Sequence, residues 1–242
     1  MAGLEHFAVV LFISFLAATL AAVTGFGGAA VLLPVLVWSF GVRDAIPILT
    51  VAQLVGNGSR VWFNRRELDL RVVGWFALGG VPMAVVGGIL FATAPLSALT
   101  RVLGLFLIVI VVWRHAPADA TWRPPLKAFA GIGAGASFLS ALLGSVGPLM
   151  APFFLAYGLV KGAYIGTEAL STVVMHVTKL AIYKQTKILT LHALLVGLLL
   201  GPVMVFGSFA GKHILDRVPE GVFIWIIEVT LVAAGLLFLV KG

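Results

Sequence analysis

The sequence lacks cysteine altogether and has few charged side chains. Because none of the 242 residues is cysteine, disulfides, thiolate metal sites and cysteine nucleophiles are excluded. Only 10% of the residues are charged, well below the roughly 25% of a typical soluble domain. This shortage of charge leaves little room for a soluble domain.

Familiar catalytic motifs are missing as well. The chain contains no H-E-x-x-H, no Walker lysine loop and no G-x-S-x-G. A membrane metalloprotease, an ATP-driven pump in one chain and a serine hydrolase therefore lack their required parts. We expect a protein that is not an enzyme and that uses no metal or other cofactor.

Long apolar runs take up most of the chain instead. Hydrophobic residues make up 61% of it, and the mean hydropathy is +1.15. A bilayer core about 30 Å thick needs roughly 20 helical residues per crossing, and runs of that order recur almost from end to end. The composition predicts an all-α, polytopic membrane protein that lies in a lipid bilayer.

The net charge of +7 does not indicate nucleic-acid binding. Lys and Arg residues stand at the ends of apolar segments rather than in a basic tail, which is typical of cytoplasmic loops. The first apolar segment, Phe7 to Val23, follows Glu5 and His6 instead of basic residues, which disfavours a cleaved signal peptide. We expect no nucleic-acid partner and keep this segment in the mature fold.

The apolar pattern predicts ten helical segments. The second and the seventh have about 12 residues or fewer and span at most about 18 Å, which is too short to cross a membrane core. We interpret both as half-helices that enter the membrane next to a glycine-rich break. The segments are 5–23, 29–40, 45–63, 71–92, 97–113, 127–143, 148–158, 160–183, 189–212 and 220–240.

These segments form two copies of a five-segment pattern. A shift of 119 residues aligns the halves, and Pro82 matches Pro202 after a one-residue slip. Internal duplication with paired broken helices is typical of secondary transporters, whose substrate binds where the repeats meet. We predict a first repeat at 1–114, a connecting loop at 115–126 and a second repeat at 127–242. The aligned pairs are Gly25 with Gly144, Gly28 with Gly147, Gln53 with Thr172, Asn57 with His176, and Arg60 with Lys179.

Each copy contains a glycine-rich break, AAVTGFGGAAVLLP at 21–34 and ALLGSVGPLMAPF at 141–153. In lipid, irregular backbone is tolerated only where protein or a water-filled cavity covers it. The start of a half-helix offers free N–H groups and the positive end of the helix dipole, which attract an anion. Close helix packing is the alternative role for these glycines. The predicted anion site comprises Gly25, Gly27, Gly28, Gly144, Ser145 and Gly147.

Polar side chains lie on one side of the third segment in each copy. They fall within an arc of about 80° in the first copy and about 140° in the second. Ionisable residues inside a membrane usually face a cavity or each other. The predicted lining residues of a substrate cavity are Gln53, Asn57, Thr172 and His176, and Arg60 and Lys179 would supply positive potential.

Other roles are open for the charged residues of these segments. Arg60 and Lys179 lie near helix ends, where their side chains could instead reach the lipid headgroups. Glu168 could pair with Lys179 or His176 and only hold the bundle together. Alternatively, Glu168 or His176 could carry a proton during transport, since histidine changes charge near neutral pH and a buried carboxyl group can be shifted towards that range.

The positions of the basic loops indicate how the segments are oriented in the membrane. Loops 64–71, 114–127 and 184–188 each carry Lys or Arg and favour the cytoplasm. They share one side if each half crosses four times, which gives eight crossings, both termini inside and repeats of like orientation. If all ten segments cross, the repeats are inverted and one basic loop faces out, which is the commoner transporter design. The loop charges favour the first arrangement, and the second stays open.

A family resemblance rests on four stretches. They are GFGGAAVLLPVLVWSFGVRDAI and NRRELDLRVV in the first copy, and GSVGPLMAPFFLAYGLVKGAYIGTEAL and YKQTKILTLHALL in the second. The chain resembles the sulfite exporter TauE/SafE family over nearly its whole length, from about residue 8 to residue 240. It departs from the family at Gly144 to Pro148, where a run of glycines is usual, and at Thr167–Glu168, where serine is common. These departures bear on the substrate rather than on the fold.

The resemblance implies export or uptake of small sulfur-containing or carboxylate anions, such as sulfite, sulfoacetate or other organosulfonates, by an ion-coupled secondary mechanism. The repeat pattern adds alternating access to this expectation. An anion channel that uses the same half-helix site is the alternative, whereas a non-transporting scaffold would have little use for polar stripes inside the membrane. We expect a small anion as the substrate, a bacterial-type inner membrane as the location, and allow for a homodimer.

Overall fold

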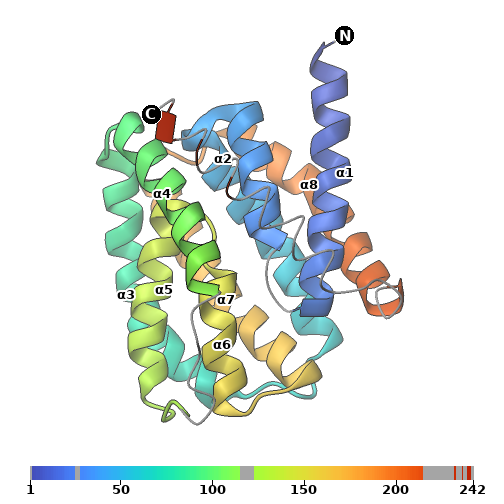
Figure 1. Cartoon of the computed structure of the whole chain (residues 1–242), viewed down its shortest axis with the longest axis vertical. Helices are drawn as coiled ribbons and strands as arrows, with labels where there is room; N and C mark the ends of the chain where they lie inside the picture. The colour runs from blue at the N-terminus through green and yellow to red at the C-terminus, as the bar shows by residue number, and fades with distance from the viewer. Residues whose placement is uncertain are drawn as a thin grey trace.

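The computed structural model describes residues 2–24, 28–114 and 123–214, and four single residues nearer the C-terminus. Within these ranges the chain forms α-helices and no strand, so the all-α prediction is confirmed (Figure 1). The last predicted segment, 220–240, lies almost wholly outside the described residues. The helices are α1 (Ala2–Thr24), α2 (Gly28–Phe63), α3 (Leu70–Thr93), α4 (Leu96–Arg114), α5 (Ala128–Leu143), α6 (Gly147–Tyr157), α7 (Lys161–Gln185) and α8 (Leu191–Ile214).

The two predicted half-helices are both short helical pieces in the structure. The first is the beginning of α2, which is interrupted at Gly41, where φ is 74° and ψ is 164°. The second is α6, with 11 residues between Gly144 and Gly158, whose φ angles are 84° and 106°. All three interruptions use glycine because a side chain disfavours positive φ.

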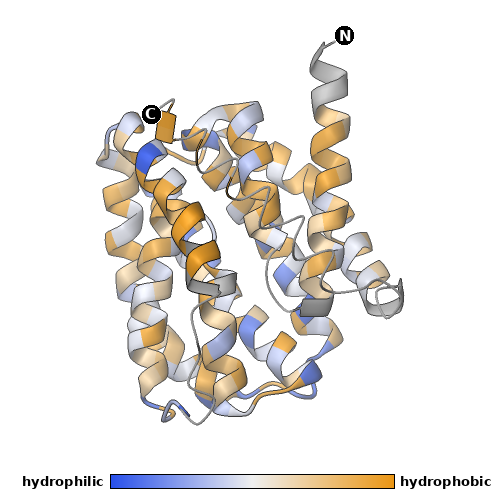
Figure 2. Ribbon diagram, viewed as in Figure 1, coloured by the Kyte–Doolittle hydropathy of each residue, from blue (hydrophilic) through white to orange (hydrophobic). Residues whose placement is uncertain are grey.

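Long apolar helices and an apolar outer surface mark a membrane protein. The helices α2, α3 and α8 each contain a stretch long and apolar enough to cross a bilayer. Exposed side chains of α8 include Leu195, Leu199, Phe206 and Phe209, and the outer helices are largely hydrophobic in Figure 2. A surface of this kind fits lipid rather than water.

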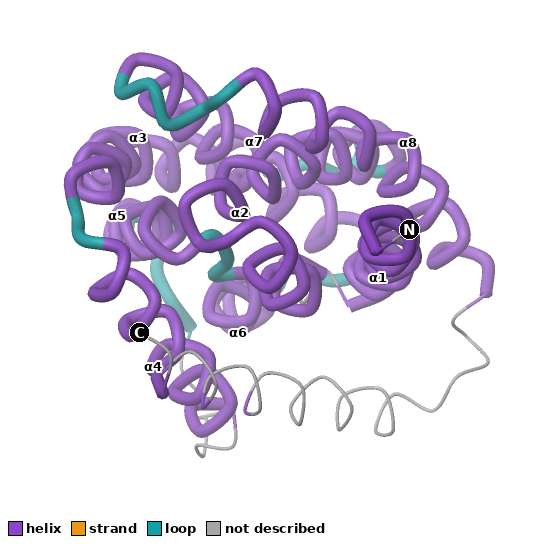
Figure 3. Tube along the Cα trace, turned by 90° about the horizontal axis from the view of Figure 1, so that it is seen from above, coloured by secondary structure: helices purple, strands orange, loops and turns teal. Residues whose placement is uncertain are grey.

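Seen from above, α2 lies in the middle of the bundle (Figure 3). Leu32, Leu33, Ile46 and Leu49 of this helix are fully buried in the larger hydrophobic cluster. The second cluster joins α3, α5 and α6, where the ring centroids of Phe129 and Phe154 are 5.0 Å apart. The helix α7 contributes to both clusters, with Tyr183 in the first and Tyr164 and Met175 in the second.

Glycines allow neighbouring helices to pack closely and reveal their relative directions. Gly79 of α3 packs on the backbone of Ala130, and Gly87, farther along α3, packs on Phe138, so α3 and α5 run in the same direction. Contacts of Gly207 and Gly211 with successive parts of α1 show that α1 and α8 are also parallel. Gly197 of α8 contacts Val51, and Gly201 contacts Val55. The second part of α2 is therefore parallel to α8 and α1.

The helix α7 runs the other way from the second part of α2. Its first residues lie against the loop between α2 and α3: the backbone N–H of Asp69 donates to Thr167 Oγ1 at 2.9 Å. The far end of α7 meets the far end of α3, where Gly88 contacts Ile182. Helices that correspond under the shift of 119 residues therefore run in opposite directions. The corresponding pairs are α1 with α5, the second part of α2 with α7, and α8 with α3.

The expectation that all basic loops share one side was wrong. The loop at 64–69 lies at the start of α7, and the loop at 186–190 follows the end of that helix, 25 residues or about 37 Å away. The residues just before α5 lie with the first of these loops, because α5 runs parallel to α3. Opposed directions of corresponding helices separate the loops, as the inverted arrangement requires. The division into two repeats itself stays a prediction.

Candidate functional site

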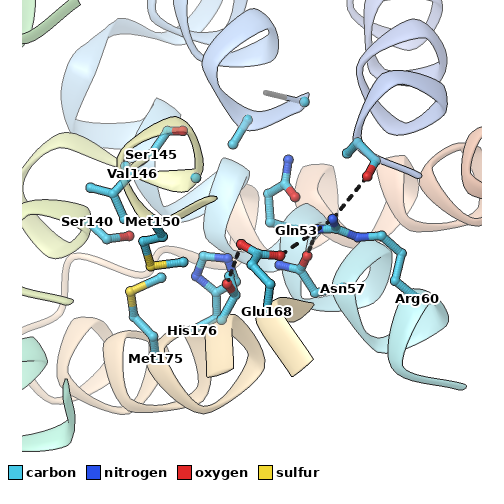
Figure 4. Close-up of a pocket in the computed structure, with 16 residues that line it drawn as sticks. Gln53, Asn57, Arg60, Ser140, Ser145, Val146, Met150, Glu168, Met175 and His176 are labelled. Carbon is cyan, nitrogen blue, oxygen red and sulfur yellow. Dashed lines mark hydrogen bonds and ion pairs between the residues drawn. The ribbon is translucent and has the colours of Figure 1, made fainter. Parts of the chain in front are cut away.

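The breaks and the polar helices meet at one small cavity of about 30 Å³ (Figure 4). One water molecule needs roughly 10–15 Å³ of such space, so the cavity holds a solute of only a few heavy atoms. Helices α1, α2, α5, α6 and α7 all contribute to its wall. It is lined by Ala21, Gly28, Ala29, Gln53, Asn57, Arg60, Ser140, Gly144, Ser145, Val146, Gly147, Met150, Glu168, Thr172, Met175 and His176.

Most of the predicted site residues lie at this cavity. From the first half these are Gly28, Gln53, Asn57 and Arg60. The second half contributes all of its predicted residues except one, namely Gly144, Ser145, Gly147, Thr172, His176 and the proton-carrier candidate Glu168. Gly25 and Gly27 lie outside the described residues, and Lys179 lies behind the wall.

Gly28, at the start of α2, has both roles considered for the glycines of the breaks, the site and close helix packing. Gly28 lines the cavity and also packs so closely on the Ala17 carbonyl and the Ala21 side chain that a Cβ would not fit. At the second break, the Gly144 N–H donates to the Ser140 carbonyl at 2.8 Å and closes α5. The chain then turns into α6, whose first residue, Gly147, again faces the cavity.

Arg60 and Glu168 form an ion pair across the two halves. The Arg60 Nη1 atom lies 3.6 Å from Glu168 Oε2, and both side chains are buried. Arg60 also donates to the Ala21 carbonyl at 3.2 Å and to Asn57 Oδ1. Thr172 Oγ1 donates to the other carboxylate oxygen, Glu168 Oε1, at 3.1 Å. The ion pair of Glu168 is therefore with Arg60, and not with Lys179 or His176.

Lys179 is fully buried one layer behind the cavity. Its Nζ atom donates to Ser140 Oγ at 3.0 Å, and Ser140 itself lines the cavity. Arg60 is buried as well, so the interpretation that these two cations reach the lipid headgroups was wrong. Both cations can stay buried because each donates a hydrogen bond to an oxygen on the first helix of its half. Arg60 donates to Ala21 of α1, and Lys179 donates to Ser140 of α5.

These two cation contacts correspond to each other under the sequence shift. Arg60 aligns with Lys179, and Ala21 aligns with Ser140, at the same offset of 119 residues. In each half the cation reaches back 39 residues to an oxygen near the end of the preceding helix. Aligned positions are thus linked in both halves, through the Ala21 carbonyl in the first and the Ser140 hydroxyl in the second.

Several buried polar atoms around the cavity have no hydrogen-bond partner among the residues that the structure describes. They are Gln53 Nε2, Ser145 Oγ, His176 Nδ1 and Glu168 Oε2. Buried polar groups in proteins are nearly always hydrogen-bonded, and leaving one unpaired costs about 1–3 kcal/mol. A polar ligand in the cavity would satisfy these atoms. No three His, Asp or Glu side chains within the described ranges come together as a metal site.

Sequence reasoning missed the two methionines of the wall and one of its hydroxyl groups. Ser140 was not predicted, although its alignment with Ala21 next to the first break could have indicated it. Met150 and Met175 were also missed, since a methionine on an apolar helix carries no signal that separates a cavity wall from ordinary packing. Figure 4 places both methionine side chains beside His176.

Comparison with known proteins identifies the family. Curated proteins give no match, and solved structures give none either. The family model described as Sulfite exporter TauE/SafE matches residues 10–238. That span covers nearly the whole chain, including both breaks and the polar helices α2 and α7. The chain therefore belongs to the sulfite exporter TauE/SafE family, whose members are membrane transporters for sulfite and related anions.

Proposed function

We propose that the protein is a secondary transporter that carries small sulfur-containing or carboxylate anions, such as sulfite, sulfoacetate or other organosulfonates, across a bacterial-type inner membrane. The observation that carries this proposal is the cavity between the two breaks, where a buried guanidinium lies beside unpaired polar atoms. Family membership supplies the general class of substrate.

The donors at the cavity suit an oxyanion. The Gln53 amide and the Ser145 hydroxyl can donate to an anionic oxygen, and Arg60 adds a positive charge with a planar set of N–H donors. Hydrogen bonds to charged groups contribute about 1.5–3 kcal/mol each, more than neutral ones. The small volume favours the smallest members of the substrate class, such as sulfite or acetate, over longer organosulfonates.

Alternating access is supported by the opposed directions of corresponding helices. Inverted halves that meet at a substrate site can exchange conformations by rocking one half against the other. The paired contacts of Arg60 with Ala21 and of Lys179 with Ser140 fit such an exchange, because each half makes the same link on its own side. Coupling to an ion gradient completes the proposal, with Glu168 and His176 as the candidate proton carriers.

Uptake into proteoliposomes tests this function. We expect labelled sulfite or acetate to enter vesicles that contain the protein faster than protein-free vesicles, and a pH gradient to change the final level. Ser145→Ala should lower the affinity for the anion, because it removes a buried hydroxyl that would donate to the ligand. Ser97→Ala, at an exposed position, is the matched control. No uptake of sulfite, sulfoacetate or acetate would refute the proposal.

Electrical recording separates the carrier from the channel. A carrier moves ions through conformational cycles, whereas a channel needs a continuous pore. Voltage-driven anion current far above the turnover of a carrier would favour the channel. The small size of the cavity, about 30 Å³, favours the carrier.

A further inference from the structure

We propose that Glu168 is the internal counter-ion of Arg60, and that a substrate anion takes its place only together with one proton, which Glu168 binds. This inference rests on the proposed anion transport and names its coupling ion and carrier. It would make transport of a monovalent anion electroneutral, with one proton moved per anion.

The carboxylate occupies the position that a substrate anion needs. Both Glu168 and Arg60 line the cavity, and Figure 4 shows the Glu168 carboxylate between the His176 ring and the side chains of Asn57 and Arg60. In the absence of any other anion, Glu168 supplies the negative charge that a buried guanidinium requires. The positive charge of Arg60 is therefore already balanced by Glu168.

The pair is held loosely enough to separate. Its closest N–O distance of 3.6 Å exceeds the 2.7–2.9 Å or so of a hydrogen-bonded ion pair. The Oε2 atom that faces Arg60 has no hydrogen bond, while Oε1 is held only by the hydroxyl of Thr172. An incoming oxyanion can thus replace Oε2 beside the guanidinium without breaking a hydrogen bond to it.

Charge explains why a proton must accompany the anion. A substrate anion next to an ionised Glu168 would place two negative charges beside one guanidinium in a site of low dielectric, where such repulsion is strong. A proton from water on Oε2 removes one of these charges and turns the carboxyl group into a donor that can bond the anion. When the anion leaves, the proton leaves with it, because Arg60 again needs a partner.

The remaining charged and titratable groups near Glu168 do not supply this balance. Helix α6 carries no charged residue, and the only one of α3 is the exposed Arg71 at its first turn. The Lys179 ammonium is bonded to Ser140 behind the wall. The others on α7 and on the loop at 64–69 that packs against its start are Lys161, Tyr164, His176, Tyr183, Lys184, Arg65, Arg66, Glu67 and Asp69. Of this group only His176 lines the cavity, so it is the competing carrier.

Methanesulfonate is a suitable test ligand, because its single charge does not titrate near neutral pH. We expect the wild-type protein in weakly buffered detergent solution to take up about one proton per methanesulfonate bound. Its affinity should then weaken about tenfold per pH unit above the point where Glu168 releases its proton, as one-proton linkage requires. Binding without proton uptake would overturn the inference and leave the transport proposal standing.

Variants identify the carrier. Glu168→Gln mimics the protonated side chain, so we expect its affinity to lose the pH slope and its vesicles to lose accumulation driven by a pH gradient while still exchanging anion. Glu67→Gln, an exposed carboxylate near the start of α7, is the matched control and should keep the wild-type slope. His176→Gln should keep the slope whatever its effect on affinity.

Three results would overturn the inference. One is an unchanged pH slope in Glu168→Gln, and another is loss of the slope in His176→Gln. The third is a folded Glu168→Gln protein that binds no anion at any pH. If Glu168→Gln does not fold, proton uptake by the wild-type protein decides alone. A wild-type protein that neither binds nor transports sulfite, acetate or methanesulfonate would instead refute the proposed function, and this inference with it.

Discussion

At the scale of single residues, the interior of this protein combines satisfied and unsatisfied polar groups. Arg60 and Lys179 are buried but bonded, whereas Gln53, Ser145 and His176 each keep a buried atom without a partner. The bonded cations tie helices together. The unpaired atoms add nothing to the stability of the fold, so they are the candidates for ligand binding.

Removing one member of the buried ion pair should destabilise the protein, and removing both should restore much of the loss. Arg60→Met leaves Glu168 without its cation, which costs about 3–5 kcal/mol for a buried pair. Arg60→Met with Glu168→Met removes both charges and should recover most of that loss, yet still not bind anions. Unfolding in detergent measures both effects. A double variant as unstable as the single one would contradict the pairing.

Gln53→Leu should weaken anion binding without lowering stability. The Gln53 amide nitrogen is buried and has no partner, so an apolar side chain of similar length removes an unsatisfied group rather than a bond. We expect the free energy of unfolding to stay equal or rise, and the affinity for sulfite or acetate to fall at least about tenfold. Gln185→Leu, at the exposed end of α7, is the control and should change neither quantity.

At the scale of helices, the decisive features are the interruptions. At Gly41 the non-helical backbone divides α2 into a short first part, which starts at the cavity, and a longer second part, which carries the polar residues. The short α6 is limited by glycines of positive φ at both ends in the same way. The beginnings of α2 and α6, which come from opposite halves of the chain, line the same cavity.

Gly41→Ala should cost stability even though the position is open. A Cβ there would meet nothing within 4 Å, but the backbone angles of 74° and 164° are accessible almost only to glycine. We expect a loss of about 1–3 kcal/mol. Gly58→Ala, in a regular part of α2 with equally open surroundings, should instead gain up to about 1 kcal/mol. Equal effects of the two substitutions on the unfolding free energy would count against strain at Gly41.

At the scale of the whole molecule, the opposed halves place basic residues unequally at the two ends. The end with the loop at 64–69 also holds the residues just before α5 and the start of α7, and so carries Arg65, Arg66, Arg71, Arg123, Lys127 and Lys161. The other end has Lys184 and Lys187, together with Arg43, which donates to carbonyls at the end of α3, and Arg101 near the start of α4. The excess of positive charge predicts that the first end lies in the cytoplasm.

Single cysteines test this orientation against a background without native cysteine. Arg66 and Lys187 are both exposed and lie at opposite ends of the bundle. We expect a membrane-impermeant maleimide to label Lys187→Cys in intact cells, and Arg66→Cys only after the cells are opened. Labelling of both positions from the same side would contradict the opposed directions of the helices.

Helix periodicity explains why much of the site could be predicted. Gln53, Asn57 and Arg60 share one face of a helix at any tertiary arrangement, and in an apolar chain such a face must turn inward. The pairing of Arg60 with Glu168 could not be predicted, because it depends on how the second part of α2 crosses α7. Met150 and Met175 were out of reach for the same reason.

The sequence by itself determined that this is a helical membrane protein, that its helices break at two glycine-rich stretches and which residues face inward. These properties depend on local backbone preference, on the cost of unpaired backbone groups in lipid and on the period of the helix. Only the tertiary structure decided that corresponding helices run in opposite directions, that Arg60 pairs with Glu168 and that the basic loops at 64–69 and 186–190 lie apart. These are contacts between distant parts of the chain, and their geometry follows from close packing at residues such as Gly28 and Gly79 rather than from any local pattern.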